Sequence, residues 1–239
     1  LEHSRYVNIS GDASFTQVTD QSALNDKRDT NDVNWVDYDN AGDLDLFLAN
    51  VGANNLYRND GAESFIDVAN AAGVRQASSG WSTAMAAWAD YDGDGFLDLY
   101  LANGGDELQL EDVLFASNGN GTFRNATAEA QLSTAGTAHL SVAWVDFDGD
   151  GSPDLYSTDG YGLGNVLSQN DTPDELFIKV TVRGKGAEEG GNNLFGIGSQ
   201  VRLFEAETDS LVAFRQVLSS SSPGEVTFGA PAGPYNVQV

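Results

Sequence analysis

Short runs that alternate apolar and polar residues recur along the chain, and glycine- and asparagine-rich stretches separate them. Residues 44–48 and 97–101 both alternate with a period of two. This period is typical of β-strands with one face in a core. The glycine- and asparagine-rich stretches, which recur every eight to twelve residues, are typical of turns. The pattern predicts an all-β fold.

Three segments, at about residues 11–60, 61–118 and 119–171, repeat the same order of features. Each has an aromatic strand-like run, then a tryptophan, an acidic loop and an alternating run. The acidic loops begin 53 and 56 residues apart, a spacing that fits one four-stranded blade of a β-propeller. We expect the recurring tryptophans to fill the gaps between packed sheets. They are Trp35, Trp88 and Trp144.

The acidic loops carry the candidate chemistry. In the second loop, residues 90–98, carboxylates occupy positions 1, 3, 5 and 9, and glycine occupies position 6. Alternate side chains of a tightly curled loop converge on one point, and a hard cation such as Ca²⁺ takes six to eight oxygen ligands. The residue at position 7 would add its backbone carbonyl. The candidate ligands are Asp37, Asp39, Asp43 and Asp45, then Asp90, Asp92, Asp94, Phe96 and Asp98, then Asp146, Asp148, Asp150, Ser152 and Asp154.

We expect up to three calcium ions. The first loop has Ala41 in place of the carboxylate at position 5, so it should bind most weakly unless a water or Asp43 completes it. An EF-hand is excluded because position 12 is Leu48, Leu101 or Ser157 and not glutamate. The alternative is that the aspartates form solvated turns.

Composition narrows the function. The chain has 36 acids, 11 bases and a formal charge of −25, which argues against nucleic acid as a partner. The chain contains no run of about 18 apolar residues, so its sequence does not predict membrane insertion. The chain lacks cysteine, which excludes thiolate zinc sites and cysteine nucleophiles. Residues 1–174 carry a net charge of −23 and residues 175–239 only −2, so we expect two regions of different character.

The segments DYDGDGFLDLYLAN and DFDGDGSPDLY, each with an upstream tryptophan, resemble FG-GAP/VCBS repeats, the calcium-binding blades of integrin-α-type β-propellers. The resemblance covers about residues 11–171. Residues 175–239 resemble the ASPIC/UnbV module that follows such repeats, and their alternation predicts a small β-sandwich. The resemblance implies an extracellular, non-enzymatic adhesion protein. Closed propellers have four to eight blades, so the three visible repeats predict an open array or part of a longer polypeptide.

We therefore expect an adhesion or scaffold protein that binds a protein partner or itself, since open sheet edges would allow assembly into a ring or fibre. One alternative is a carbohydrate-binding module that stacks a glycan on Trp81 or Tyr161. A hydrolase using Ser82 and His139 is the remaining alternative. The glycosylation pattern is matched at Asn8, Asn120, Asn125 and Asn170.

Overall fold

The computed structural model describes residues 6–7, 16–17, 24–61, 64–76, 82–104, 110–132, 139–160, 162, 164–173, 177–183, 199–217, 224–230 and 232–239. Over these residues the chain forms 18 strands and one helix of four residues. All of the pairings between strands are antiparallel, so the predicted all-β class is confirmed. Two short strands near the start of the chain, β1 (Tyr6–Val7) and β2 (Thr16–Gln17), pair with each other.

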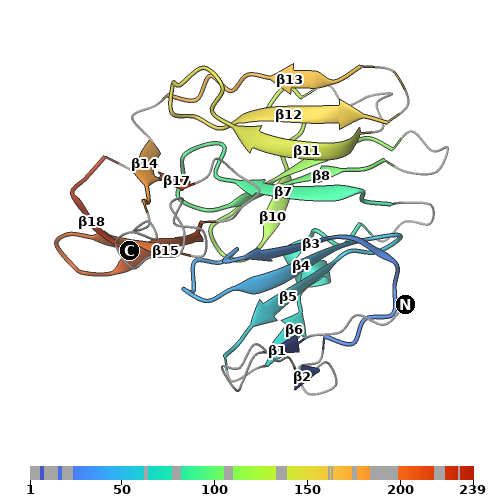
Figure 1. Cartoon of the computed structure of the whole chain (residues 1–239), viewed down its shortest axis with the longest axis horizontal. Helices are drawn as coiled ribbons and strands as arrows, with labels where there is room; N and C mark the ends of the chain where they lie inside the picture. Colours follow the sequence, from blue (N-terminus) through green and yellow to red (C-terminus); the bar gives the residue numbers. More distant parts are fainter. Residues whose placement is uncertain are drawn as a thin grey trace, which may run out of the picture.

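Three small sheets form the repeat region, and in Figure 1 the second lies between the first and the third. Each sheet is a meander in which consecutive strands are neighbours. The first contains β3 (Thr30–Val36), β4 (Asp45–Asn50), β5 (Asn55–Asn59) and β6 (Phe65–Asp67). The second contains β7 (Met85–Ala89), β8 (Asp98–Ala102), β9 (Val113–Ser117) and β10 (Phe123–Asn125). The third contains β11 (His139–Val145), β12 (Asp154–Asp159) and β13 (Val166–Ser168).

The sheets are out of phase with the sequence repeats. The run at residues 64–68, which opens the second repeat, forms β6 and pairs with β5 of the first sheet, and the helix α1 (Ala69–Ala72) follows it. In the same way, β10 comes from the third repeat and pairs with β9. In the described part of the chain, the third sheet has only three strands. Each of the first two sheets is therefore completed by residues of the next repeat.

Aromatic side chains fill the two spaces between the sheets. Phe47 of the first sheet meets Trp88 of the second edge to face, with ring centroids 5.7 Å apart. Tyr100 of the second sheet meets Trp144 of the third in the same way at 6.3 Å. The expected packing role is thus seen for Trp88 and Trp144. Trp35 lies on the outer side of the first sheet, where 41% of it is exposed.

The C-terminal strands form two further sheets at the left of Figure 1. They share one core, in which Val201, Leu203, Val226 and Phe228 are buried, as expected for a small β-sandwich. We call residues 177–239 the C-terminal module. Its first sheet pairs β14 (Phe177–Thr181) with β17 (Glu225–Gly229). Its second has the order β16 (Leu211–Gln216), β15 (Gln200–Glu205), β18 (Tyr235–Gln238).

The first prediction compares one repeat position in two sheets. Phe47 is fully buried against Trp88, whereas Tyr156, at the same place in the third sheet, is 38% exposed. Phe47→Ala should lower the free energy of unfolding by about 3–5 kcal/mol, because it leaves a cavity. Tyr156→Ala should cost about 1 kcal/mol or less, since little packing is lost. Chemical denaturation of both variants measures the difference, and equal losses would contradict this packing scheme.

Candidate metal centres

Each acidic loop joins the first two strands of a sheet. Residues 37–45, 90–98 and 146–154 connect β3 to β4, β7 to β8 and β11 to β12. The ninth residue of each loop is also the first residue of the second strand. At position 6, Gly42, Gly95 and Gly151 have φ angles of 92°, 94° and 99°, a region that disfavours residues with a Cβ. The curl of the loop therefore depends on glycine at this position.

Backbone amides hold the aspartates in a repeated pattern. The Oδ2 atom at position 1 accepts a hydrogen bond from the glycine amide at position 6, at 3.1 Å for Asp37, 3.0 Å for Asp90 and 3.2 Å for Asp146. The aspartate at position 9 accepts two amides, one from position 2 and one from the end of the third strand or, in the third loop, from Asn170 just after β13. For Asp98 these are Tyr91 at 2.9 Å and Ser117 at 2.8 Å. The loop is thereby tied to two strands.

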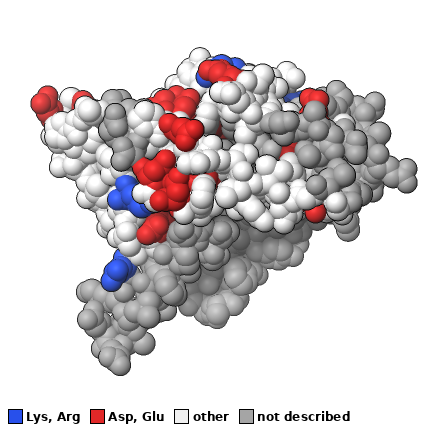
Figure 2. All heavy atoms as spheres, turned by 90° about the horizontal axis from the view of Figure 1, so that it is seen from above, with Lys and Arg blue, Asp and Glu red and all other residues white. Residues whose placement is uncertain are grey.

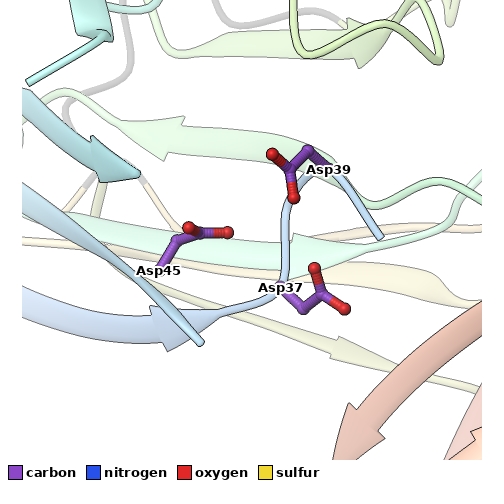
Figure 3. A group of neighbouring side chains, drawn as sticks. All are labelled: Asp37, Asp39 and Asp45. Carbon is purple, nitrogen blue, oxygen red and sulfur yellow. The ribbon is translucent and has the colours of Figure 1, made fainter. Parts of the chain in front are cut away.

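With these hydrogen bonds in place, one oxygen from each of three aspartates in every loop lies within 4.8 Å of the others. Figure 3 shows the first cluster, with Asp37 and Asp39 on the loop and Asp45 beyond it. The second cluster uses positions 1, 3 and 5, and the third uses positions 1, 3 and 9. The three sets are Asp37, Asp39 and Asp45, then Asp90, Asp92 and Asp94, then Asp146, Asp148 and Asp154.

Two loops contain buried carboxylate oxygens that no hydrogen-bond donor satisfies within the described part of the chain. They are one Oδ1 atom each of Asp37, Asp43, Asp90 and Asp92. An unsatisfied buried acceptor is costly and calls for an unseen partner such as a cation or water. These oxygens lie in the loops that gather the carboxylates, so the donor set fits a hard cation. Asp43 also supplies the first loop with a buried oxygen that Ala41 cannot provide.

Burial opposes ionisation of these carboxyl groups. Desolvation raises the pKa of both Asp37 and Asp90 to about 6, although their amide hydrogen bonds and the charge of Arg215 act in the opposite direction. For Asp45 and Asp98, desolvation raises the pKa to about 8 and about 9. A bound divalent cation would favour the charged form of each group, so the ionised carboxylate would again be the stable form at neutral pH.

Other predicted ligands lie beside these clusters. Asp98 uses both carboxylate oxygens for amides and lies at the base of its loop. Asp150 accepts hydrogen bonds from the amide and hydroxyl of Ser152 at 2.9 and 2.8 Å. The Ser152 hydroxyl also reaches the carbonyl of Asn170 at 2.7 Å, so its side chain fastens the loop to the chain after β13. Phe96 donates its amide to Asp94 at 2.9 Å.

The C-terminal module contacts all three acidic loops. The buried guanidinium of Arg215, on β16, donates to the Asn40 side chain at 3.3 Å and to the Gly95 carbonyl at 3.4 Å, which places it between the first and second loops. Asn40 itself donates to the same Gly95 carbonyl at 3.0 Å. Lys179, on β14, forms an ion pair with Asp146 of the third loop. Figure 2 shows basic side chains beside a compact group of acidic ones.

The module also contacts the second loop through its backbone. The Gly229 amide, at the end of β17, donates to Asp90 Oδ2 at 2.6 Å. A Cβ at Gly229 would lie 2.1 Å from that oxygen and 2.6 Å from the carbonyl carbon of Gly93. Only glycine therefore allows β17 to sit against the second loop.

A second repeated contact escaped the sequence analysis. A side chain just before the third strand of each sheet accepts the amide at the end of the second strand. The acceptors Asn54, Asp112 and Asn165 bind the amides of Asn50, Asn103 and Asp159 at 3.0, 2.8 and 3.2 Å. The signal was the shared Asn/Asp-x-Leu at residues 54–56, 112–114 and 165–167.

The remaining candidates are not gathered into a site. Asn8, Trp81 and Tyr161 lie outside the described residues. Asn120 and Asn125 are exposed, whereas Asn170 uses its amide nitrogen to bind the carbonyls of Tyr91 and Pro153 at 2.8 and 3.1 Å. That nitrogen is the atom that glycosylation would modify.

The two residues of the hydrolase alternative have separate partners. The Ser82 hydroxyl accepts from the Asn31 side chain at 3.1 Å. His139 is buried and pairs through Nδ1 with Asp112, which also accepts the Tyr100 hydroxyl at 2.8 Å. These contacts place His139 in the packing between the second and third sheets.

The stacked antiparallel meanders and their acidic loops define a β-repeat protein of the propeller-blade type. The FG-GAP-like repeat model matches residues 37–101 and 90–157, which together span half of the chain. The chain therefore belongs to the FG-GAP-like repeat family. No curated protein matches it. In the described residues, no helix has the length and apolar character needed to cross a bilayer.

Among solved structures, the chain is similar to an Agrocybe aegerita lectin that recognises non-reducing terminal N-acetylglucosamine. The sequence identity is 19% and the TM-score is 0.36. The likeness covers 90% of this chain and 60% of the lectin chain, so this chain spans less than two thirds of that protein.

The raised pKa values predict an unusual pH dependence. Between about pH 4 and pH 6, the metal-free folded protein keeps protons on Asp37 and Asp90 that the unfolded chain releases. The folded state binds more protons, so its stability should fall as the pH rises through this window, and Asp45 and Asp98 extend the fall toward pH 8–9. Thermal unfolding of the protein in a chelator across this range measures the trend. A rise in stability over the same range would contradict it.

The contact at Gly229 predicts a large effect from one methyl group. Gly229→Ala should destabilise the protein by about 1–3 kcal/mol, because the Cβ overlaps Asp90 and the loop backbone. Gly233→Ala is the matched control, since its Cβ would lie no closer than 3.7 Å to another residue, and should change stability by about 0.5 kcal/mol or less. Thermal and urea unfolding compare the two variants. Equal effects would mean that β17 does not rest on the second loop.

Proposed function

We propose that this chain is a non-enzymatic, calcium-binding scaffold that acts in adhesion outside the cell. The observation that carries the proposal is the set of buried, unpaired carboxylate oxygens in the first and second of the three loops that each gather three aspartates. Calcium would be structural. By neutralising the carboxylates, it would hold the first two strands of each sheet and the loops against which the C-terminal module packs.

Calcium fits this site better than other common cations. The ligand groups in the three acidic clusters are aspartate carboxylates, which hard cations prefer, and these clusters contain neither cysteine nor histidine. Mg²⁺ requires a small, regular octahedron, whereas Ca²⁺ accepts six to eight ligands in irregular loops. Extracellular calcium sites of this kind have dissociation constants of roughly 10⁻⁴–10⁻³ M, which suits a compartment rich in calcium.

The three sites should differ in affinity. The sequence favours the first loop as the weakest, because Ala41 lacks a carboxylate. The unpaired Asp43 oxygen supports a fuller ligand set in that loop. The ion pair of Lys179 with Asp146 instead favours the third loop as the weakest, since a cation there must displace or tolerate an ammonium group.

The adhesion role follows from what the chain offers to partners. The formal charge of −25 favours cationic protein surfaces, and filling three calcium sites would leave −19. Its partner would be another protein or another copy of the chain.

Calcium should stabilise the folded protein. Binding to the folded state alone adds about 1.4 kcal/mol for each site at a calcium concentration ten times its dissociation constant. Three filled sites would raise the melting temperature by on the order of 10 °C. Differential scanning calorimetry with millimolar calcium or with EDTA measures the shift, and isothermal titration calorimetry measures the number of ions. An identical melting temperature in both conditions would overturn the structural role.

Asp92→Asn tests whether the second loop holds one of these ions. The change removes a charge at an unpaired buried oxygen while it preserves shape, so it should weaken that site on the order of tenfold. Glu207→Gln, at an exposed turn of the C-terminal module, is the control with the same loss of charge. If both variants bind calcium like the original chain, the second loop is not a calcium site.

A further inference from the structure

The fourth strand of each complete sheet begins with a phenylalanine that packs on the tryptophan of that sheet. Phe65 of β6 meets Trp35 with ring centroids 6.1 Å apart, and Phe123 of β10 meets Trp88 at 5.9 Å. Phe123 also meets Tyr38 of the first sheet at 6.2 Å. Both phenylalanines are buried. The fourth strand therefore supplies an aromatic side chain that completes the packing around each of these tryptophans.

The third sheet has no such strand in the described part of the chain. Among the described strands, β13 pairs with β12 alone, and it forms the upper edge of the sheet in Figure 1. In the second sheet the corresponding strand, β9, is covered by β10, and the Leu114 carbonyl accepts the Ala126 amide at 2.8 Å. The backbone of Leu167, the counterpart of Leu114, meets no such strand among the described residues. The sheet is therefore one strand short.

A cavity of about 600 Å³ lies beside this open edge. Its walls include Tyr91 and Trp144, which hold the repeat positions of Tyr38 and Trp88, the two rings that Phe123 meets. Among the described ring contacts, Trp144 meets only a ring of the second sheet, and no ring from a fourth strand. The cavity therefore occupies the place that a phenylalanine fills between the first two sheets.

The second sheet shows where an added strand would lie on the third. Phe123 pairs with Ser117 of β9. Asn170 holds the place of Ser117, since each donates its amide at 2.8 Å to the aspartate at position 9 of its acidic loop. Residues 168–173, at and beyond the end of β13, line the cavity. A phenylalanine opposite Asn170 would therefore lie at the cavity.

The chain carries a third run of the kind that forms these fourth strands. The run that opens the second repeat, SFIDV at residues 64–68, contains β6, and the run that opens the third, TFRNA at 122–126, contains β10. The run that opens the first repeat is SFTQV, at residues 14–18. Its described part, β2, pairs with the two residues of β1. A ribbon of two such short strands is weakly stable, so little stability is lost when the run leaves it.

We propose that residues 14–18 of one copy of this chain add to β13 of a second copy as the fourth strand of its third sheet. Phe15 would lie opposite Asn170, in the cavity beside Tyr91 and Trp144. Backbone hydrogen bonds to the open edge and one buried aromatic anchor are the two elements of β-strand addition. The contact rests on the proposed scaffold function and deepens it by naming a second copy as the partner.

A second copy is the donor that the structure favours. In Figure 1, β1 and β2 lie at the bottom and the third sheet lies at the top, with the second sheet between the first and the third. The SFTQV run is uncharged, so its insertion adds no negative charge beside the acidic loops. Each copy carries one donor run and one acceptor sheet. Copies therefore associate into an open chain unless the contacts close into a ring.

Sedimentation velocity of the whole chain in millimolar calcium tests the association. We expect the mean mass to rise with protein concentration, and a mass that stays at 25.3 kDa at every concentration would overturn the proposal. Phe15→Ser should weaken the association on the order of tenfold or more, because it removes the aromatic anchor. Thr16→Ser is the control, since its counterparts Ile66 and Arg124 are exposed, and it should associate like the original chain.

Gln169→Pro tests the acceptor edge. Leu114 and Asn118 form backbone hydrogen bonds on the β10 side of β9, so Ala116 between them directs its amide to the same side. Gln169 is the counterpart of Ala116, and proline there removes the amide that an added strand would use. Gln169→Ala is the matched control, because both variants lose the side-chain contact with Asp148 at 2.7 Å. Only the proline variant should fail to associate, and equal behaviour of the two would contradict strand addition at this edge.

Complementation separates this contact from any other. The Phe15→Ser chain keeps its acceptor sheet and the Gln169→Pro chain keeps its donor run. Each alone should be monomeric at concentrations where the original chain associates, whereas their mixture should form a one-to-one dimer. A synthetic peptide of residues 11–20 should bind the Phe15→Ser chain once, with a dissociation constant in the micromolar range. The same peptide with serine in place of phenylalanine should not bind.

A mixture that fails to dimerise, or a Phe15→Ser chain that associates like the original, would reject the exchange of this strand. Circular dichroism and the calcium-dependent melting shift show that each variant is folded. The same shift separates the two proposals, because an original chain that stays monomeric but keeps the shift rejects only the contact between copies. A missing shift in the original chain rejects the calcium role independently of its mass.

Discussion

Close packing of like charge is the constraint on which this structure depends. Each acidic loop holds three carboxylates with oxygens within 4.8 Å of one another, an arrangement that repels itself unless opposite charge is near. The backbone enforces it, since amides from the loop and from the third strand hold the aspartates at positions 1 and 9. The electrostatic repulsion within each loop therefore affects the stability of the whole sheet.

The same constraint explains where the C-terminal module lies. The repeat region carries most of the negative charge, and the module brings Arg215 and Lys179 to the loops. Arg215 is buried between two loops, and desolvation lowers its pKa even though Asp90 and Asp37 act to raise it. A fixed internal cation thus offsets part of the charge at the first two loops, and a bound ion would offset the rest.

The parts of this structure that local chemistry decides were predictable from the sequence. The acidic loop is specified within nine residues, because glycine at position 6 and aspartate at alternate positions determine its curl. Contacts between distant segments were not predictable. Nothing in the sequence around Gly229 indicates that a Cβ there would overlap Asp90, which lies 139 residues away. Likewise, the position of Arg215 in an alternating strand does not indicate its contact with the acidic loops. The assignment of the run at residues 64–68 to the first sheet was also hidden, since pairing across a repeat boundary leaves no mark on periodicity.

That offset between repeat and sheet has a mechanical consequence. β6 and β10 come from the repeats that follow their sheets. Unfolding the first or the second sheet therefore also detaches the strand that leads into the next repeat. Tension applied along the polypeptide would be shared across the boundary and would not open one unit at a time. A protein that holds surfaces together under load would gain mechanical stability from strands that are shared between successive repeats in this way.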